Sequence, residues 1–298
     1  MPEPDLVEAL CDVTGATVAY DLRDDQGRAM DTLKVIADPA GGYLAVYHCG
    51  VGRGRFDVHV ATSPDLARWA WRARLDELAS QPHIVAMPDG GFLVALEAGG
   101  AGTPPWVRVL DYAGRDDLLA GAAARRFDAP HTLVPRRKHA EGTPNIYAAT
   151  PDRSRIDIGF HYWRRGRVDR QARGVLTGFA DWSTRREPRI DAALEHWGVR
   201  GNIGGRDAFT WKGREYLLIE GQTEPGGWHT WRTYLYDVAA QTAWPLPIRT
   251  HGGSAAIANP AVTLLEGPRP TLVVTAYLFH AGAADGEGGP MLYHRPLS

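Results

Sequence analysis

The stretch DTLKVIADPAGGYLAVYH at residues 31–48 has the pattern that decides the fold. An apolar segment leads into a turn rich in Pro and Gly, and a second apolar segment then ends on a polar residue. The pattern returns as SQPHIVAMPDGGFLVALE at residues 80–97, and three further copies lie at 142–163, 206–222 and 258–280. No copy has the apolar spacing that is typical of a helix, so each predicts a β-hairpin.

Weaker strand candidates follow the hairpins. They lie at 55–65, 67–75, 105–114, 124–130, 230–240 and 243–249. Four strands per repeat, recurring roughly every 50 to 60 residues, predict an all-β protein built as a five-bladed β-propeller with four-stranded antiparallel blades. The blades are expected to start near residues 31, 80, 142, 205 and 257.

The last repeat lacks an outer strand. ATVAYDLR at residues 16–23 is expected to supply it and so close the ring, which removes open sheet edges. Short helices are expected at 4–10, 116–126 and 191–197, but they do not alternate with the strands, which disfavours an α/β fold. A two-sheet β-sandwich is the structural alternative. The whole chain, 1–298, is expected to be one domain.

Composition excludes several functional classes. The net charge is −2, so nothing in the overall balance attracts nucleic acid or an acidic membrane. No run of about 18 apolar residues occurs, and no secretion signal is visible, so we expect a soluble cytoplasmic protein. Cys11 and Cys49 are too few for a disulfide framework and are expected to be reduced. The oligomeric state is not predicted.

The polar residues of the repeat suggest a ligand site. In a propeller of this type, the start of each innermost strand and the end of the next strand meet at one mouth of the central channel. The strand starts carry Asp31, Gln81, His83, Glu141, Asn145, Arg206, Asp207 and Asn259. The strand ends carry His48, Glu97, His161, Glu220 and His280, with Trp163 close behind. Buried charge without a partner is costly, so this recurrence predicts a funnel that binds a small molecule.

One short motif points to a family. The stretch ATSPDLARWAW at residues 61–71 contains Ser-x-Asp-Leu-x-x-Trp after the third strand of a blade, and a degenerate copy lies at 178–188. With the blade pattern, this resembles the five-bladed glycosidases of families 43, 62 and 32 and related phosphorylases. The motif is expected to be structural, with its Asp turning the chain and its Trp packing between blades.

The resemblance also implies catalytic roles. It implies a catalytic base in the first blade, matched by Asp31, and a modulating acidic residue in the third, matched by Glu141. In the fourth blade Asp207 stands where the family has the Glu that acts as acid, and Glu220 is the alternative. The apolar residues that precede Glu220 in the sequence favour it as the acid, since burial raises the pKa of a carboxyl group. Asp38 lies in an Ala-Asp-Pro sequence like the family's base motif, but we interpret it as a turn residue.

Three functions remain open at this stage. The first is a glycoside hydrolase-like enzyme for a small glycoside or oligosaccharide, working by acid/base chemistry with two carboxyl groups. The second is a carbohydrate-binding propeller without catalysis. The third is a propeller recruited to a lyase or cyclase reaction. No cofactor is required, although His48, His161 and Glu97 are residue types that could hold a divalent metal.

Overall fold

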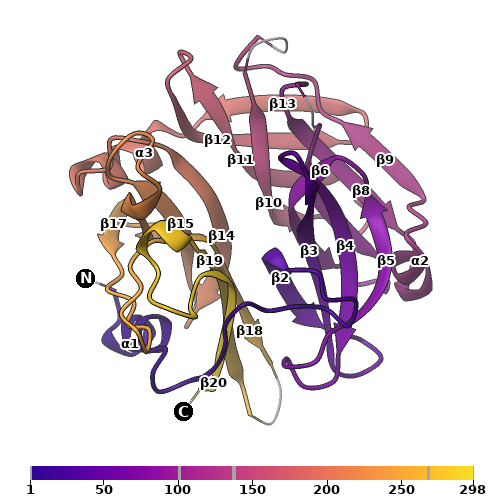
Figure 1. Cartoon of the computed structure of the whole chain (residues 1–298). Helices are drawn as coiled ribbons and strands as arrows, with labels where there is room; N and C mark the ends of the chain where they lie inside the picture. The colour runs from indigo at the N-terminus through magenta and orange to yellow at the C-terminus, as the bar shows by residue number, and fades with distance from the viewer. Residues whose placement is uncertain (1, 100–101, 136–138, 267–268, 298) are drawn as a thin grey trace. The chain divides into compact units, whose positions relative to one another are not determined.

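The computed structural model describes residues 2–99, 102–135, 139–266 and 269–297. Its strands form five four-stranded antiparallel sheets, so the protein is an all-β, five-bladed β-propeller, as the hairpin repeat predicts (Figure 1). The innermost strands begin at Asp31, Ala79, Glu141, Ile203 and Ile257, close to the predicted blade starts. The sandwich alternative is therefore wrong.

The chain divides into two compact units. The blade 1–3 unit comprises Arg23–Arg167 and Gln171–Arg186. The blade 4–5 unit comprises Met1–Leu22, Val168–Arg170 and Glu187–Ser298.

The blade 1–3 unit contains twelve strands, and within each of its sheets the strands follow one another in chain order. The first three residues of β12 belong to the other unit. Blade 1 is β2 (Asp31–Ala37), β3 (Tyr43–Gly52), β4 (Arg55–Ser63) and β5 (Ala70–Asp76). Blade 2 is β6 (Ala79–Ala86), β7 (Phe92–Ala98), β8 (Trp106–Tyr112) and β9 (Arg125–Asp128). Blade 3 is β10 (Glu141–Ala149), β11 (Arg155–Arg164), β12 (Val168–Thr177) and β13 (Asp181–Arg186). Between β8 and β9, α2 (Arg115–Ala120) is shorter than predicted, because Gly121 adopts φ +68° and ends it.

In the blade 4–5 unit, the N-terminal segment completes the last blade. Blade 4 is β14 (Ile203–Trp211), β15 (Arg214–Gln222), β16 (Trp231–Asp237) and β17 (Thr242–Pro245). Blade 5 is β18 (Ile257–Leu265), β19 (Thr271–Leu278), β20 (Gly289–Pro296) and β1 (Thr17–Ala19). Val18 pairs with Tyr293, which confirms the predicted outer strand.

The helical elements of this unit are α1 (Pro4–Cys11), α3 (Pro188–His196), η1 (Trp228–Thr230) and η2 (His280–Gly282). Residues 267 and 268, in the predicted turn between β18 and β19, lie outside the described residues.

Apolar side chains form the core between neighbouring blades, because alternate residues of each strand face opposite sides of its sheet. Leu44 and Val60 of blade 1 pack in one cluster with Phe92 and Val94 of blade 2. In the blade 4–5 unit, α1 contributes Leu10 to a cluster with residues of both blades. Trp211 belongs to that cluster and donates its indole N–H to Glu3, so its role is packing.

Each innermost strand has an irregularity near its start. The register shifts by one residue between Asp31 and Lys34, Ser80 and His83, Gly142 and Asn145, Ile203 and Arg206, and Ala258 and Ala261. In four of these β-bulges a residue other than glycine has positive φ: Thr32 (+50°), Gln81 (+52°), Thr143 (+48°) and Asn259 (+47°). Such conformations are strained and persist only where the surroundings hold them. A bulge also leaves backbone groups unpaired within its own sheet.

The Ser-x-Asp-Leu-x-x-Trp motif forms a turn that is held by hydrogen bonds from backbone amides to its own side chains. Ser63 Oγ accepts the amides of Asp65 and Leu66, and Asp65 Oδ1 accepts those of Ala67 and Arg68. Trp69 is buried and donates its indole N–H to the Leu66 carbonyl. The Asp turns the chain as predicted, and the motif is structural.

Asp38 is likewise a turn residue. Its carboxylate accepts the Ala40 amide and a two-point contact from the Arg115 guanidinium, with Nε···Oδ1 and Nη2···Oδ2 both at 2.7 Å. It lies at the opposite end of β2 from Asp31. The position of Asp38 in the turn after β2 agrees with its predicted role.

The described part of the chain has no helix with the length and apolarity needed to cross a membrane. Cys11 and Cys49 are free and buried, as expected, and burial raises the pKa of the Cys11 thiol to about 12.

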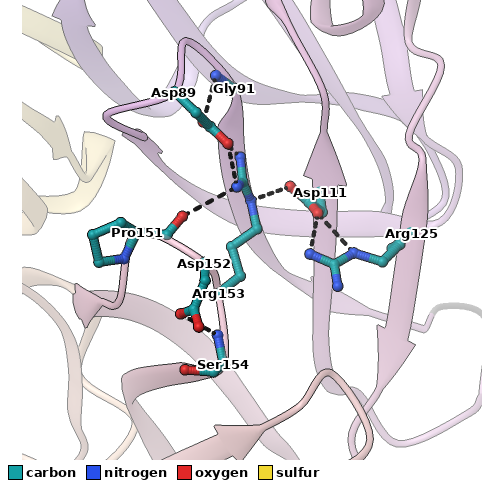
Figure 2. A network of polar contacts seen from close by, with 8 residues as sticks. All are labelled: Asp89, Gly91, Asp111, Arg125, Pro151, Asp152, Arg153 and Ser154. Atoms are coloured by element: carbon teal, nitrogen blue, oxygen red, sulfur yellow. Dashed lines mark hydrogen bonds and ion pairs between the residues drawn. The ribbon is translucent and has the colours of Figure 1, made fainter.

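A buried guanidinium joins blades 2 and 3 at their hairpin turns (Figure 2). Arg153 Nη1 and Nη2 contact Asp89 Oδ2 and Oδ1 at 2.6 and 2.9 Å, and its Nε donates to Asp111 Oδ1 at 2.8 Å. Arg125 contacts the other oxygen of Asp111. The hydrogen bonds from Arg153 lower the pKa of Asp89 to about 2.

Replacing Arg153→Leu is expected to lower Tm at pH 7 by several degrees, because both carboxylates lose a partner. A carboxyl group with a lowered pKa stabilises the fold above its unfolded pKa of about 3.9 and loses that effect as pH falls toward 2. The difference in Tm from the wild type should therefore shrink between pH 7 and pH 2.5, measured by circular dichroism. Arg155→Leu, which removes an exposed partner of Asp157 in the same hairpin, is the control. An equal difference at both pH values would contradict the assignment.

Candidate functional site

Strand pairing places the predicted polar strand ends of blades 1 to 4 beside the start of the innermost strand of the same blade. Asp31 pairs with His48, Ser80 with Glu97, and Gly142 with His161. In blade 4, Ile203 pairs with Gly221, which sets Glu220 beside the start of β14. The sequence interpretation was wrong for blade 5: Ala258 pairs with Tyr277, and His280 lies past the end of β19, in η2.

The strand ends accept amides that the bulges leave unpaired in their own sheets. Gln81 N–H donates to His48 Nδ1 at 3.1 Å, and Thr143 N–H donates to Glu97 Oε2 at 2.9 Å. Asn259 N–H donates to Glu220 Oε2. In all three cases the donor has positive φ and lies on the innermost strand of the following blade. The recurrence of polar strand ends thus has a structural cause within each unit.

His48 is a neutral imidazole. Because a backbone amide can only donate, Nδ1 is an acceptor and Nε2 carries the ring proton. The Thr32 hydroxyl is 2.7 Å from the same nitrogen and completes its contacts. Burial lowers the pKa of His48 to about 3, so this ring does not titrate near neutral pH.

Glu97 and Glu220 each lie directly against a glycine of the neighbouring strand. A Cβ atom on Gly142 would lie 2.1 Å from Glu97 Oε2, and one on Gly204 would lie 2.2 Å from Glu220 Oε1. Glu220 also accepts the Gly205 amide on Oε1, so both of its oxygens have amide donors. Hydrogen bonds from amides stabilise an ionised carboxylate. These contacts argue against the predicted role of Glu220 as the acid.

Glu141 anchors a loop. Its Oε1 accepts the amides of Thr132, Leu133 and Val134 at 2.9, 2.6 and 3.0 Å. The side chain is buried. This arrangement suits a structural role better than the predicted modulating role, which remains a prediction.

Further predicted residues also serve contacts within a unit. His83 Nδ1 accepts the Ile146 amide at 3.4 Å, and Asp207 Oδ2 accepts the Val262 amide at 2.8 Å. The buried Arg206 guanidinium pairs with Glu187 Oε2 at 3.2 Å. Asn145 is buried as well, whereas His161 and Trp163 are half-buried.

Asp31 has a different setting. It is half-buried and is the first residue of β2, immediately before Thr32 in the bulge. The corresponding residues before the other register shifts are Ser80, Gly142, Ile203 and Ala258. Of these five positions, only that of Asp31 carries an ionisable side chain.

The sequence analysis did not identify several residues that make buried or strand-end contacts in the blade 4–5 unit. Arg170 is buried and donates to the carbonyls of Asp169 and Gly201 and to Glu195. Gln222 donates to the Gly227 carbonyl at the end of β15. The Pro that follows the bulge residue in three blades, after Gln81, Thr143 and Asn259, was the signal that could have located the bulges.

The described residues contain no group of three or more His, Cys, Asp or Glu side chains that could hold a metal ion. The metal alternative for His48, His161 and Glu97 therefore has no geometric support.

The fold has many counterparts among solved structures. No protein-family model and no curated protein matches the chain in sequence. A thermostable family-43 glycoside hydrolase superposes with a TM-score of 0.60 at 12% identity, covering 94% of this chain and 93% of that one. An α-L-arabinofuranosidase from Lactobacillus brevis gives 0.60 at 9% identity, covering 90% of each chain. The Bacillus subtilis arabinanase gives 0.59 at 12% identity, covering 94% and 97%.

These superpositions show that the protein has the fold of the family-43 glycosidases, as the blade pattern and motif indicate. At such low identity they show the fold alone.

Glu97→Ala is expected to lower the free energy of unfolding by about 1–3 kcal/mol, because the Thr143 amide loses its acceptor. Glu97→Gln keeps an oxygen acceptor and should cost less. Urea unfolding measures both, with exposed Glu8→Ala as the control. An unchanged stability in Glu97→Ala would mean that this side chain does not join the two blades.

Proposed function

We propose that the protein is a glycoside hydrolase-like enzyme that acts on a small glycoside or oligosaccharide. The observation that carries this proposal is the likeness over at least 90% of both chains to structures described as a glycoside hydrolase, an arabinofuranosidase and an arabinanase. A match of this extent spans all five blades and is not limited to a single shared sheet.

Asp31 is the residue we assign to the reaction, as general base. It is the single ionisable side chain among the five positions that precede the bulges, and a β-bulge re-aims the side chains around it. An ionised carboxylate at that place could activate a water molecule for attack on the anomeric carbon.

A second candidate is a carbohydrate-binding propeller without catalysis. It is favoured by the contacts of Glu97, Glu141 and Glu220, all of which accept backbone amides. Hydrolysis with two carboxyl groups needs one that is held protonated, and acceptor-only contacts do not provide this.

Turnover of 4-nitrophenyl glycosides (α-L-arabinofuranoside, β-D-xyloside and β-D-galactoside) separates the two candidates. We expect the wild type to hydrolyse at least one, and Asp31→Asn to lower kcat by about 10²–10⁴-fold, the usual contribution of a general base. Glu8→Gln, an exposed carboxylate on α1, is the matched control and should leave kcat unchanged. Full activity in Asp31→Asn would overturn the assignment of the base.

If no glycoside is turned over, the second candidate makes its own prediction. Arabinotriose, xylotriose or galactotriose should then raise Tm, since a ligand at 100 times its Kd stabilises the fold by about 2.7 kcal/mol. Differential scanning fluorimetry measures this effect. Neither turnover nor a Tm shift would reject both candidates.

A further inference from the structure

The blade 4–5 unit contains a cluster of aromatic rings, which we call the aromatic platform: Trp228, Trp231, Tyr277 and Phe279. Phe279 is at its centre, with ring centroids 5.0 Å from Trp228, 5.3 Å from Tyr277 and 6.1 Å from Trp231. Trp228 lies in η1 and Trp231 is the first residue of β16, whereas Tyr277 is in β19 and Phe279 follows it. The platform therefore joins blades 4 and 5.

Trp228 is the exposed member. It is 58% exposed, more than any other large hydrophobic side chain of the described residues, whereas Trp231 is 6% exposed and Trp211 8%. A tryptophan that served only to pack the two blades would be covered as those two are. The Trp228 ring is instead largely exposed while it contacts the Phe279 ring.

The loop that carries Trp228 is braced. Arg232 Nη1 donates to the carbonyls of His229, Trp231 and Ala255, at 3.0, 2.7 and 3.1 Å. Thr230 Oγ1 donates to the Gly227 carbonyl at 2.7 Å and accepts the Glu224 amide. The exposed ring is thus held in place before any ligand arrives, which lowers the entropic cost of binding.

The platform lies at the end of the blades where the bulges are. η1 follows the end of β15, close behind Glu220, and Tyr277 pairs with Ala258, the neighbour of the bulge residue Asn259. Polar residues are next to its members in the sequence: His229 follows Trp228, His280 follows Phe279, and the half-buried Asn259 follows Ala258.

One polar atom of the platform lacks a partner. The indole N–H of Trp231 is buried and has no hydrogen-bond acceptor among the described residues. An unsatisfied buried donor destabilises the fold, so an acceptor from outside the chain is favoured there. A hydroxyl group, directly or through a water molecule, would supply it.

We infer that the aromatic platform is a subsite for a sugar ring, with the apolar C–H face of the ring stacked on Trp228 and its hydroxyl groups directed to the flanking polar side chains. This inference rests on the proposed carbohydrate ligand and adds where one unit of an oligosaccharide binds. A sugar offers both features that the platform lacks: an apolar face for an exposed aromatic ring and oxygen acceptors for a donor. A purely apolar partner would leave the Trp231 N–H unsatisfied.

Trp228→Ala is the test, with Trp197→Ala as the matched control, since Trp197 is 44% exposed in the same unit but belongs to no such cluster. Arabinotriose, xylotriose and galactotriose serve as probes in isothermal titration calorimetry. We expect Trp228→Ala to weaken the Kd of the trisaccharide that binds by at least about tenfold, the loss typical of a central aromatic contact. Intrinsic fluorescence should change on binding in the wild type and in Trp197→Ala, and not in Trp228→Ala.

If Trp197→Ala fails to fold because its indole contact with the Ala243 carbonyl is lost, Val51→Ala, at an exposed apolar residue, replaces it. An unchanged Kd in folded Trp228→Ala overturns the subsite and leaves the proposed function standing. No binding of any probe to the wild type overturns the subsite, and it overturns the proposed function as well only if no glycoside is turned over. A wild-type dimer that becomes monomeric in Trp228→Ala, measured by light scattering, also overturns the subsite, because a second copy of the chain would then cover the platform.

Discussion

A bulge near the start of each innermost strand leaves backbone groups unpaired within their own sheet, and the blades depend on those groups finding partners. The amides of Gln81, Thr143 and Asn259 find them in His48, Glu97 and Glu220 of the preceding blade. Each contact also holds a residue at positive φ, a conformation that needs support from its surroundings. A buried amide without a partner would cost as much as a lost hydrogen bond. The polar strand ends are thus fixed by the backbone of the neighbouring blade.

This constraint limits what the same side chains can do in catalysis. A carboxylate that accepts amides on both oxygens, as Glu220 does, is oriented by the backbone around it. An imidazole with a pKa lowered to about 3, as in His48, exchanges no proton near neutral pH. Asp31 in the blade 1–3 unit and the aromatic platform in the blade 4–5 unit carry our functional proposals, one for the reaction and one for the ligand.

Much of the architecture could be predicted from the sequence. Hairpin repeats with Pro/Gly turns gave the five blades, and the missing outer strand identified residues 16–23 as the segment that completes blade 5. The Asp38 turn and the Asp65 turn followed from local chemistry, because an Asp side chain caps amides two or three residues on. The end of α2 at Gly121 was missed, since the apolar spacing continued past the glycine.

The candidate site was only half predictable. The sequence by itself determined that polar residues recur at the ends of apolar strands, because strand alternation and turn chemistry are local properties. It could not determine that Glu97 and Glu220 face amides of the following blade, because those donors are 46 and 39 residues away along the chain. Nor could it gather Trp228 and Phe279, on separate strand connections, into one aromatic platform. Such contacts exist only after the blades pack, so tertiary structure alone decided which polar residues are structural and which remain for a ligand.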